Sequence, residues 1–244
     1  MSNYAIVVNT HSSSIDVLTI FLNQLEKYYP NNKVYILTDN GEDISTKHNI
    51  ILYDSKDKFR TQYLKSIKQV SEDYILYLNE DYILYDYVNK DKINDYLITL
   101  SNNPDISFIR LTRGPNITNN KLTDDLYLAD NKLEYFFSQT ASLWKRESLI
   151  NIHENGPDTH IGIGGSTYGH FEIDANKVCC DLDIKGLVAY NGEKLRGTDH
   201  YDSNVFPYIA TAIIKGKWNV SEYKNELIPL LNEYNIDVKI RGEV

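Results

Sequence analysis

Two adjacent carboxylates, Glu80 and Asp81, interrupt a run of large β-forming residues that extends from Tyr74 to Leu84. The part of this run before the acids has no polar alternation, which is typical of a strand covered on both faces of a parallel sheet. Because neighbouring acids are costly to bury without a counter-charge, we expect them at the carboxyl edge of the sheet, where open α/β folds place their ligands. A bound metal ion would supply that charge. An ordinary acidic turn between two hairpin strands explains the same residues equally well.

Polar residues also follow the other predicted strands of the N-terminal half. The buried runs 4–8, 33–37 and 49–53 lead respectively into Thr10 and His11, into Asp39, and into Asp54. Parallel strands of a doubly wound sheet end at one edge, so several loops of this kind together build a binding surface.

Helical periodicity fills the intervals between these strands. Apolar residues recur at helical spacing after Ser12–Ser14, after Asp57 and over 91–101. The first 110 or so residues therefore alternate strand and helix, which predicts an α/β fold with a mostly parallel central sheet and helices on both faces. The stretch 112–131 is rich in Asn, Asp and Thr and is expected to be a long surface excursion. The residues 135–143 form a further β-like run. No linker is visible, so we expect a single domain over 1–244.

Composition limits the classes of function. The 244 residues carry a net charge of −9, and the hydrophobic fraction of 42% is that of an ordinary globular protein. The acidic balance argues against nucleic acid as a partner. No apolar run reaches the roughly 20 residues of a membrane-spanning helix and no signal peptide is recognisable, so the expected location is cytoplasmic. The adjacent Cys179 and Cys180 are expected to be reduced core residues.

The order of short motifs along the chain resembles that of nucleotide-sugar glycosyltransferases with the GT-A fold, in particular small enzymes of large DNA viruses and of bacterial surface-glycan clusters. The resemblance covers nearly the whole chain, and the segments that carry it are Asp39 after the second strand, Arg60 before the central strand, LNED at 78–81, SQTASLWKRESL at 138–149, GHFEID at 169–174, and a tail with His200 and KGKWN at 215–219. One departure concerns the metal motif of the family, Asp-x-Asp, whose first position here is Asn79. Asp81 is then the matching carboxylate.

The resemblance implies that 1–110 bind the nucleotide-sugar donor, while 111–244 bind the acceptor and supply a closing segment. The donor-binding residues would be Thr10, His11, Asp39, Arg60, Asn79, Glu80, Lys215 and Lys217. Asp39 would accept from the base or ribose, although the first position of a DNG turn explains it as well. The two lysines would neutralise the diphosphate, although lysines beside a glycine are more often simply solvated.

For the chemistry, the resemblance implies Mn²⁺ or Mg²⁺ held by Asp81, with His200 as a further ligand. Such a cation stabilises the charge that grows on a departing diphosphate. In an inverting transfer a carboxylate deprotonates the acceptor hydroxyl, and Glu172 is the first choice for this base, with Asp174 the second. Trp144 is expected to stack on an acceptor sugar, with a buried core position as the alternative.

The sequence thus predicts a metal-dependent, inverting glycosyltransferase. It would move a sugar from a nucleotide-diphosphate donor, a UDP- or GDP-sugar being favoured, to a hydroxyl of a glycan or glycoconjugate. A nucleotidyltransferase is the nearest enzymatic alternative, but it would need a glycine- and arginine-rich loop after the first strand. A catalytically inactive glycan- or nucleotide-binding module is the alternative from another class, which Asn79 favours. An enzyme needs Glu172 and Asp81 at one cleft, and a binding module does not.

Overall fold

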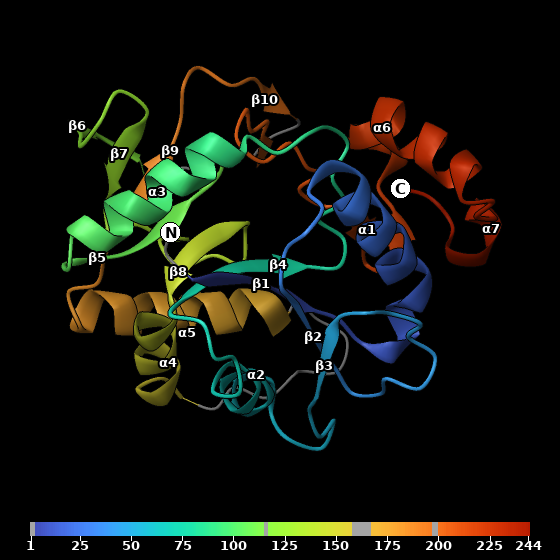
Figure 1. Ribbon diagram of the computed structural model, residues 1–244, viewed down its shortest axis with the longest axis horizontal. Helices are drawn as coiled ribbons and strands as arrows, with labels where there is room; N and C mark the ends of the chain where they lie inside the picture. The colour runs from blue at the N-terminus through green and yellow to red at the C-terminus, as the bar shows by residue number, and fades with distance from the viewer. Residues whose placement is uncertain (1–2, 115–116, 158–166, 197–199) are drawn as a thin grey trace.

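The fold is built on one large sheet. The computed structural model describes residues 3–114, 117–157, 167–196 and 200–244, with the backbone alone at 167–170. Within these residues a nine-stranded sheet has the order β3-β2-β1-β4-β8-β5-β9-β7-β6 (Figure 1). Its strands are β1 Tyr4–Asn9, β2 Val34–Thr38, β3 Asn49–Leu52, β4 Tyr74–Asn79, β5 Ile106–Arg110, β6 Ile117–Lys121, β7 Leu126–Ala129, β8 Ser142–Lys145 and β9 Lys185–Ala189.

Seven of the nine strands run in the same direction, and β7 and β8 run against them. β1 pairs in parallel with β2 and β4, β2 with β3, and β5 with β9. β8 is antiparallel to both β4 and β5, and β7 is antiparallel to β9 and β6. The predicted α/β class with a mostly parallel sheet is therefore confirmed, and the polar loops after β1, β2 and β4 lie at one edge.

Helices cover both faces of this sheet (Figure 1). They are α1 Ile15–Tyr28, α2 Phe59–Ile67, α3 Lys90–Asn102, α4 Arg146–Glu154, α5 Thr167–Asp181, α6 Val220–Glu233 and α7 Val238–Arg241, with a short 3₁₀ turn η1 at Ser12–Ser14. Two small hairpins, β10 Leu195–Arg196 with β11 His200–Tyr201 and β12 Ile213–Ile214 with β13 Lys217–Trp218, complete the described chain.

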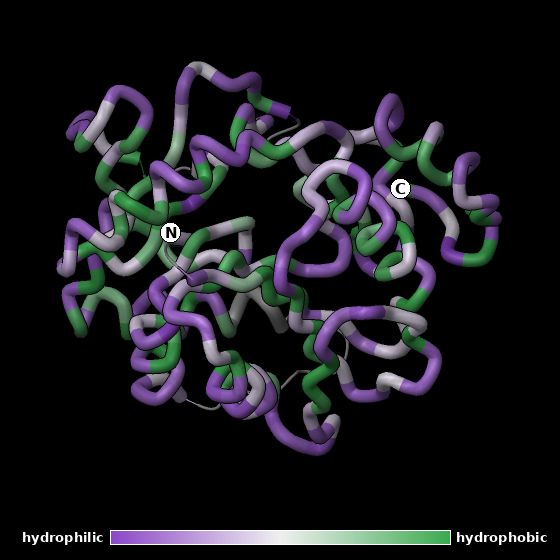
Figure 2. The backbone as a smooth tube through the Cα atoms, viewed as in Figure 1, coloured by the Kyte–Doolittle hydropathy of each residue, from purple (hydrophilic) through white to green (hydrophobic). Residues whose placement is uncertain are grey.

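The central strand β4 separates two hydrophobic cores. Leu76 and Leu78 belong to the core beneath α1, α3 and α6, whereas Ile75 and Tyr77 belong to the core beneath α2, α4 and α5. Figure 2 shows the same arrangement, with hydrophobic residues along the inner strands and hydrophilic residues in the outer loops. The unalternated run of β4 is thus explained by burial on both faces.

Three expectations about local structure were wrong. The β-like run at 135–143 is mostly loop, because Tyr135 has a φ of 60°, a left-handed conformation that a strand does not allow, and β8 begins only at Ser142. The excursion at 112–131 contains the β6–β7 hairpin, because β7 pairs with β9 and extends the sheet. Of the two cysteines, Cys179 is buried but Cys180 is exposed.

The C-terminal segment returns to the start of α1. Arg241 donates through Nε to Asp16 Oδ2 (2.6 Å) and through Nη2 to the carbonyl of Ser13 (3.0 Å). Trp218 and Leu227 are fully buried in the core beneath α1. Within the described residues, no helix has the length and apolar character needed to span a membrane.

A substitution at Gly186 tests the β5–β9 pairing. A Cβ at this position would lie 2.1 Å from Cε1 of the buried Phe108 ring, a sub-van-der-Waals contact between neighbouring strands. We expect Gly186→Ala to lower the free energy of unfolding by about 1–3 kcal/mol, the usual cost of overpacking. Urea unfolding measures this loss. In the Phe108→Leu background the same change should cost clearly less, and equal costs in the two backgrounds would contradict the predicted contact.

Candidate functional site

A first pocket lies at the carboxyl ends of β1 and β4, and we call it the strand-end pocket. It has a volume of about 350 Å³ and is lined by Asn9, Thr10, His11, Ser13, Ser14, Tyr53, Ser55, Phe59, Gln62 and Glu80. The structure therefore brings together three residues that the sequence assigned to donor binding, Thr10, His11 and Glu80. Tyr53 and Gln62 were missed, although Tyr53 ends a predicted strand of the same set and its hydroxyl donates to the carbonyl of Thr10 (2.8 Å).

Asp39 fixes the loop that forms one wall of this pocket. The Ser12 backbone N–H donates to Oδ1 (2.7 Å) and its hydroxyl to Oδ2 (2.9 Å), while His11 Nε2 lies 3.3 Å from Oδ2. Burial tends to raise the pKa of Asp39, but the hydrogen bonds from Ser12 and the charge of His11 outweigh it and lower that pKa below its ordinary value. Asp39 is thus an anion that positions Ser12 and His11.

The end of β4 carries an unusual pair of acids. Burial raises the pKa of Glu80 to about 6, against the opposing effects of a hydrogen bond from Ser14 and the charge of Arg241. Burial, followed by the charge of Glu80, raises the pKa of Asp81 well above its ordinary value, although the backbone N–H of Ile213 donates to it. Two carboxyl groups that repel each other in a poorly solvated place form a site that an added cation would stabilise.

A second pocket lies beyond β8, and we call it the arginine pocket. It has a volume of about 390 Å³ and is lined by Arg110, Thr112, Arg113, Gly114, Tyr135, Ser138, Thr140, Glu172, His200, Tyr201 and Ala210. Glu172 and His200 were predicted as site residues. Arg110 and Arg113 were missed, although Arg110 ends the buried run of β5 just as Asn79 ends that of β4.

Helix α5 holds Glu172 against the loop before β8. Glu172 Oε1 accepts from the backbone N–H of Gln139 (2.7 Å), and one turn later Asn176 Oδ1 accepts from that of Phe137 (3.0 Å). Burial raises the pKa of Glu172, and the Gln139 hydrogen bond and the charge of Arg110 oppose this only in part. Arg110 in turn donates through Nη2 to the carbonyls of Tyr135 and Phe136 (2.7 Å each), which stabilises the left-handed backbone at Tyr135.

The two pockets are joined by a short hydrogen-bonded chain. Asn79 Nδ2 donates to Gln139 Oε1 (3.4 Å), and the backbone of Gln139 donates to Glu172. The buried Tyr82 hydroxyl also donates to the carbonyl of Gln139 (2.7 Å). The end of β4 and the candidate base Glu172 therefore both bond to the loop that contains Gln139.

Two predicted residues lie in the core instead. The Arg60 guanidinium is buried, with Nη1 3.4 Å from His153 Nδ1 and the Phe171 ring 5.2 Å away, and it does not line the strand-end pocket. Trp144 is 2% exposed and stacks on Phe108 with ring centroids 4.3 Å apart, so its ring is not available to an acceptor sugar. The core position, which the sequence left open, is the one that Trp144 occupies.

Three further predicted residues lie away from both pockets. Asp174 lies two residues after Glu172 in α5, and its carboxylate lies 3.8 Å from the Lys177 ammonium group. Lys215 and Lys217 lie at the turn of the β12–β13 hairpin, where both are exposed and neither lines a described pocket. Their donor-binding role stays a prediction.

The expected metal ligands do not form a closed cluster. His200 Nδ1 pairs with Glu222 (2.9 Å) and its Nε2 lies 3.3 Å from the Thr211 hydroxyl, while Asp81 accepts from the backbone N–H of Ile213. Among the residues that the structure describes, no group of three or more His, Cys, Asp or Glu side chains could hold a metal ion. Glu80 and Asp81 alone remain as a candidate pair of oxygen ligands.

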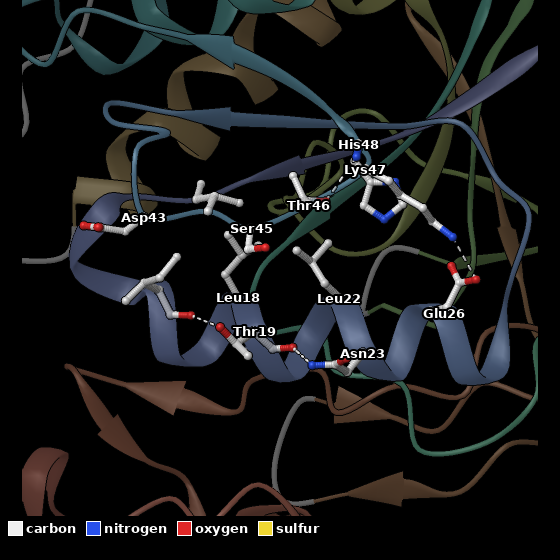
Figure 3. A pocket seen from close by; sticks show the side chains of 12 residues that line it. Leu18, Thr19, Leu22, Asn23, Glu26, Asp43, Ser45, Thr46, Lys47 and His48 are labelled. Carbon is white, nitrogen blue, oxygen red and sulfur yellow. Dashed lines mark hydrogen bonds and ion pairs between the residues drawn. The ribbon is translucent and has the colours of Figure 1, made fainter.

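A third hollow, between α1 and the loop at 43–48, is separate from these sites. Figure 3 shows Leu18, Leu22 and Asn23 of the helix facing Ser45, Thr46 and His48 of the loop, with a Lys47–Glu26 ion pair (3.0 Å) at one end. Its polar side chains bond mainly to their own helix backbone or to each other. It contains no group of residues that suggests catalysis.

Comparison with known proteins identifies the fold. No family model and no curated protein sequence matches this chain. The structure of CMP:2-keto-3-deoxy-manno-octonic acid synthetase complexed with CTP is similar with a TM-score of 0.50 at 11% identity, over 77% of this chain and 89% of that chain. S. aureus TarS 1-349 is similar with a TM-score of 0.51 at 15% identity, over 87% of this chain and 61% of that one.

A longer S. aureus TarS structure has a TM-score of 0.52 at 12% identity, and the match covers 97% of this chain but 39% of that one. The chain thus spans less than two thirds of both TarS structures. Likeness at such low identity concerns the arrangement of strands and helices. It confirms the predicted GT-A-like α/β fold with its mostly parallel central sheet.

The raised pKa of Glu80 predicts how the free energy of unfolding depends on pH. Because the folded pKa of Glu80 is raised to about 6, the folded state binds its proton more tightly than the unfolded state, and stability is lost as pH rises from the unfolded value towards 6. Glu80→Gln, which still accepts from Ser14, should therefore raise the free energy of unfolding at pH 8 by about 1–2 kcal/mol. At pH 4 the gain should vanish. Urea unfolding in the presence of EDTA measures both values, and a loss of stability at pH 8 would contradict the assignment.

Proposed function

We propose that this protein is a metal-dependent glycosyltransferase of the inverting type, which moves a sugar from a nucleotide-diphosphate donor to a hydroxyl of a glycan or glycoconjugate. The observation that carries the proposal is the hydrogen-bonded chain from Asn79, which precedes Glu80 of the strand-end pocket, through Gln139 to Glu172 of the arginine pocket. A transferase needs a donor and an acceptor in contact, and this arrangement supplies adjoining places for both.

The strand-end pocket supplies the donor site in this proposal. All of its lining residues come from the first 80 positions, whereas those of the arginine pocket lie between 110 and 210, in keeping with a donor half at 1–110 and an acceptor half at 111–244. Tyr53 and Phe59 offer aromatic surface to a base, and Thr10, Ser55 and Gln62 offer hydrogen-bonding groups. The fold is shared with a synthetase solved with CTP, which supports a nucleotide as the ligand.

The acid pair suits a hard divalent cation. Glu80 and Asp81 present carboxylate oxygens, and Mg²⁺ and Mn²⁺ accept few protein ligands when phosphates and waters complete the shell. When bound, such a cation stabilises negative charge on the leaving diphosphate. His200 Nδ1 already pairs with Glu222 (2.9 Å), so we do not include His200 among the proposed metal ligands.

Glu172 is the candidate general base. Burial raises its pKa, which makes its carboxylate a stronger proton acceptor, and Gln139 fixes the orientation of one oxygen. It would take the proton of an acceptor hydroxyl held in the arginine pocket as that hydroxyl attacks the sugar. A nucleotidyltransferase or an inactive binding module would use the strand-end pocket but would have no need of this base.

The test of the proposal is a thermal-shift panel of UDP, GDP, CDP and TDP, each with and without Mn²⁺. A ligand that binds only the folded state raises the unfolding midpoint. At a ligand concentration a hundredfold above Kd, it raises the free energy of unfolding by about 2.7 kcal/mol. A shift by one nucleotide that requires Mn²⁺ would support the donor class. No shift with any nucleotide would overturn the proposal.

Asp81→Asn tests the cation site within the same panel. The amide oxygen can still accept from Ile213 and the buried charge is removed, so we expect the midpoint without ligand to hold or rise. The Mn²⁺-dependent nucleotide shift should disappear. An unchanged shift would show that Asp81 does not hold the cation, and a collapse of the unliganded midpoint would make it a structural residue.

Glu172→Gln tests the base. Its side-chain oxygen can still accept from Gln139, so we expect an unchanged nucleotide shift together with a loss of turnover of about 100-fold or more. In the native protein log kcat should rise with pH along an acid limb whose midpoint lies above the ordinary glutamate value, since the deprotonated form is active and its pKa is raised.

The matched control is Asn176→Ala, which removes the neighbouring hydrogen bond to the same loop without touching the base. It should lower stability and retain the pH profile. Turnover of Glu172→Gln at the native rate would eliminate Glu172 as the base.

A further inference from the structure

Arg113 is held at the arginine pocket by two tyrosine rings. Its guanidinium carbon lies 4.4 Å from the ring centroid of Tyr190 and 4.9 Å from that of Tyr201, and the two rings meet nearly edge to face at 80°. Cation–π contacts of this kind position a guanidinium without neutralising its charge. Thr112 beside it is anchored by donating to the carbonyl of Tyr201 (3.0 Å).

The surroundings of Arg113 differ from those of the arginines elsewhere on the surface. Arg146, Arg196 and Arg241 each form an ion pair with a carboxylate at 2.7 Å or less. Among the residues that the structure describes, Arg113 forms no ion pair with a carboxylate. Within the described part of the chain, its charge is therefore held by aromatic rings and not by a carboxylate, in a protein whose net charge is −9.

The remaining lining of the pocket complements a polar ligand. Arg110 adds a second positive charge, and Thr112, Ser138 and Thr140 add hydroxyl groups. Ser138 and Thr140 are bonded to each other (2.8 Å), and Tyr135 is half exposed at the rim. The guanidinium lies over the Tyr201 ring, so the aromatic surface at this position is accompanied by a positive charge.

We propose that the arginine pocket takes an acceptor that carries an anionic group, a carboxylate or a phosphate ester, and that Arg113 pairs with it. This inference specifies the class of acceptor and rests on the proposed function, since the ligand of this pocket is an acceptor only in a transferase. A guanidinium presents a planar set of N–H donors that matches the oxygens of both groups. Because the two tyrosines order it beforehand, little side-chain entropy is lost on binding.

The experiment uses the full chain and three probes, glucose, glucuronate and glucose 6-phosphate, titrated by isothermal calorimetry. The uronate and the sugar phosphate distinguish the two anionic groups, and glucose is the neutral reference. We expect at least one anionic probe to bind about tenfold or more tighter than glucose, the effect of one charge-assisted contact. Arg113→Gln should abolish this preference, and Arg113→Lys should retain part of it.

The matched control is Lys121→Gln. Lys121 lies over the ring of Tyr127 (4.9 Å), so its substitution removes the same charge and a similar cation–π contact away from the pocket. It should leave the preference unchanged. Glucose binding as tightly as both anionic probes, or equal losses in the Arg113→Gln and Lys121→Gln variants, would overturn the inference.

The thermal-shift panel separates this inference from the proposed function. Arg113→Gln should keep the native Mn²⁺-dependent nucleotide shift, because Arg113 does not line the strand-end pocket. If the preference for anionic probes depends on Arg113 but no nucleotide shifts the midpoint, the anion site is supported and the proposed transferase function is contradicted. A nucleotide shift without anion preference would retain the transferase and overturn the inference.

Discussion

The candidate site depends on the burial of β4 on both faces. Four consecutive residues of this strand, Ile75 to Leu78, are almost inaccessible to solvent and contribute alternately to the two cores. A strand of this kind accepts no polar side chain along its length, so the first polar residues must appear where it leaves the sheet. Asn79, Glu80 and Asp81 appear at that point. The same constraint acts on β1 and β2, whose ends supply Thr10 and Asp39, and the shared direction of these strands gathers the polar residues on one edge.

The antiparallel strand β8 connects this edge to the second half of the chain. It lies between β4 and β5, so the loop before it passes directly beside the end of β4. Gln139 in that loop bonds to Asn79 through its side chain and to Glu172 through its backbone. A parallel strand in the same place would begin at the opposite edge of the sheet, and its preceding loop would lie far from the acids. The inserted antiparallel strand therefore brings the two pockets together.

The sequence predicted the parts of the fold that depend on local pattern. The runs of β1, β2 and β4 are apolar without interruption, and α1 has a clear amphipathic face, so each was recognisable by itself. β8 was misplaced because it has only four residues and its start is set by a turn at Tyr135, whose left-handed backbone depends on Arg110 from β5. Interactions between segments far apart in the sequence leave no periodic signal.

The same distinction applies to the site. Glu80 was proposed because it follows the apolar run of β4, and Glu172 because GHFEID at 169–174 resembles a motif of the GT-A glycosyltransferases. Arg60 was assigned to a ligand although it shares a helical face with the core residues Tyr63 and Ile67, and this spacing already places it inward, against His153. The contacts of Arg113 with Tyr190 and Tyr201 could not be predicted from the sequence. Tyr190 follows β9, which pairs with β5 and β7, and Tyr201 belongs to the separate β10–β11 pair.

The distribution of charge across the edge gives the two pockets opposite requirements. On the side of β4, Glu80 and Asp81 concentrate negative charge that burial makes unfavourable, so a ligand there must bring a cation. On the side of β5, Arg110 and Arg113 concentrate positive charge around Glu172, so a ligand there is favoured if it brings an anion. The acid pair does not stabilise the empty fold, because it keeps like charges close together in a poorly solvated place. One loop, which contains Gln139, is hydrogen-bonded to both Asn79 and Glu172, and in the proposed function it lies between the donor and the acceptor.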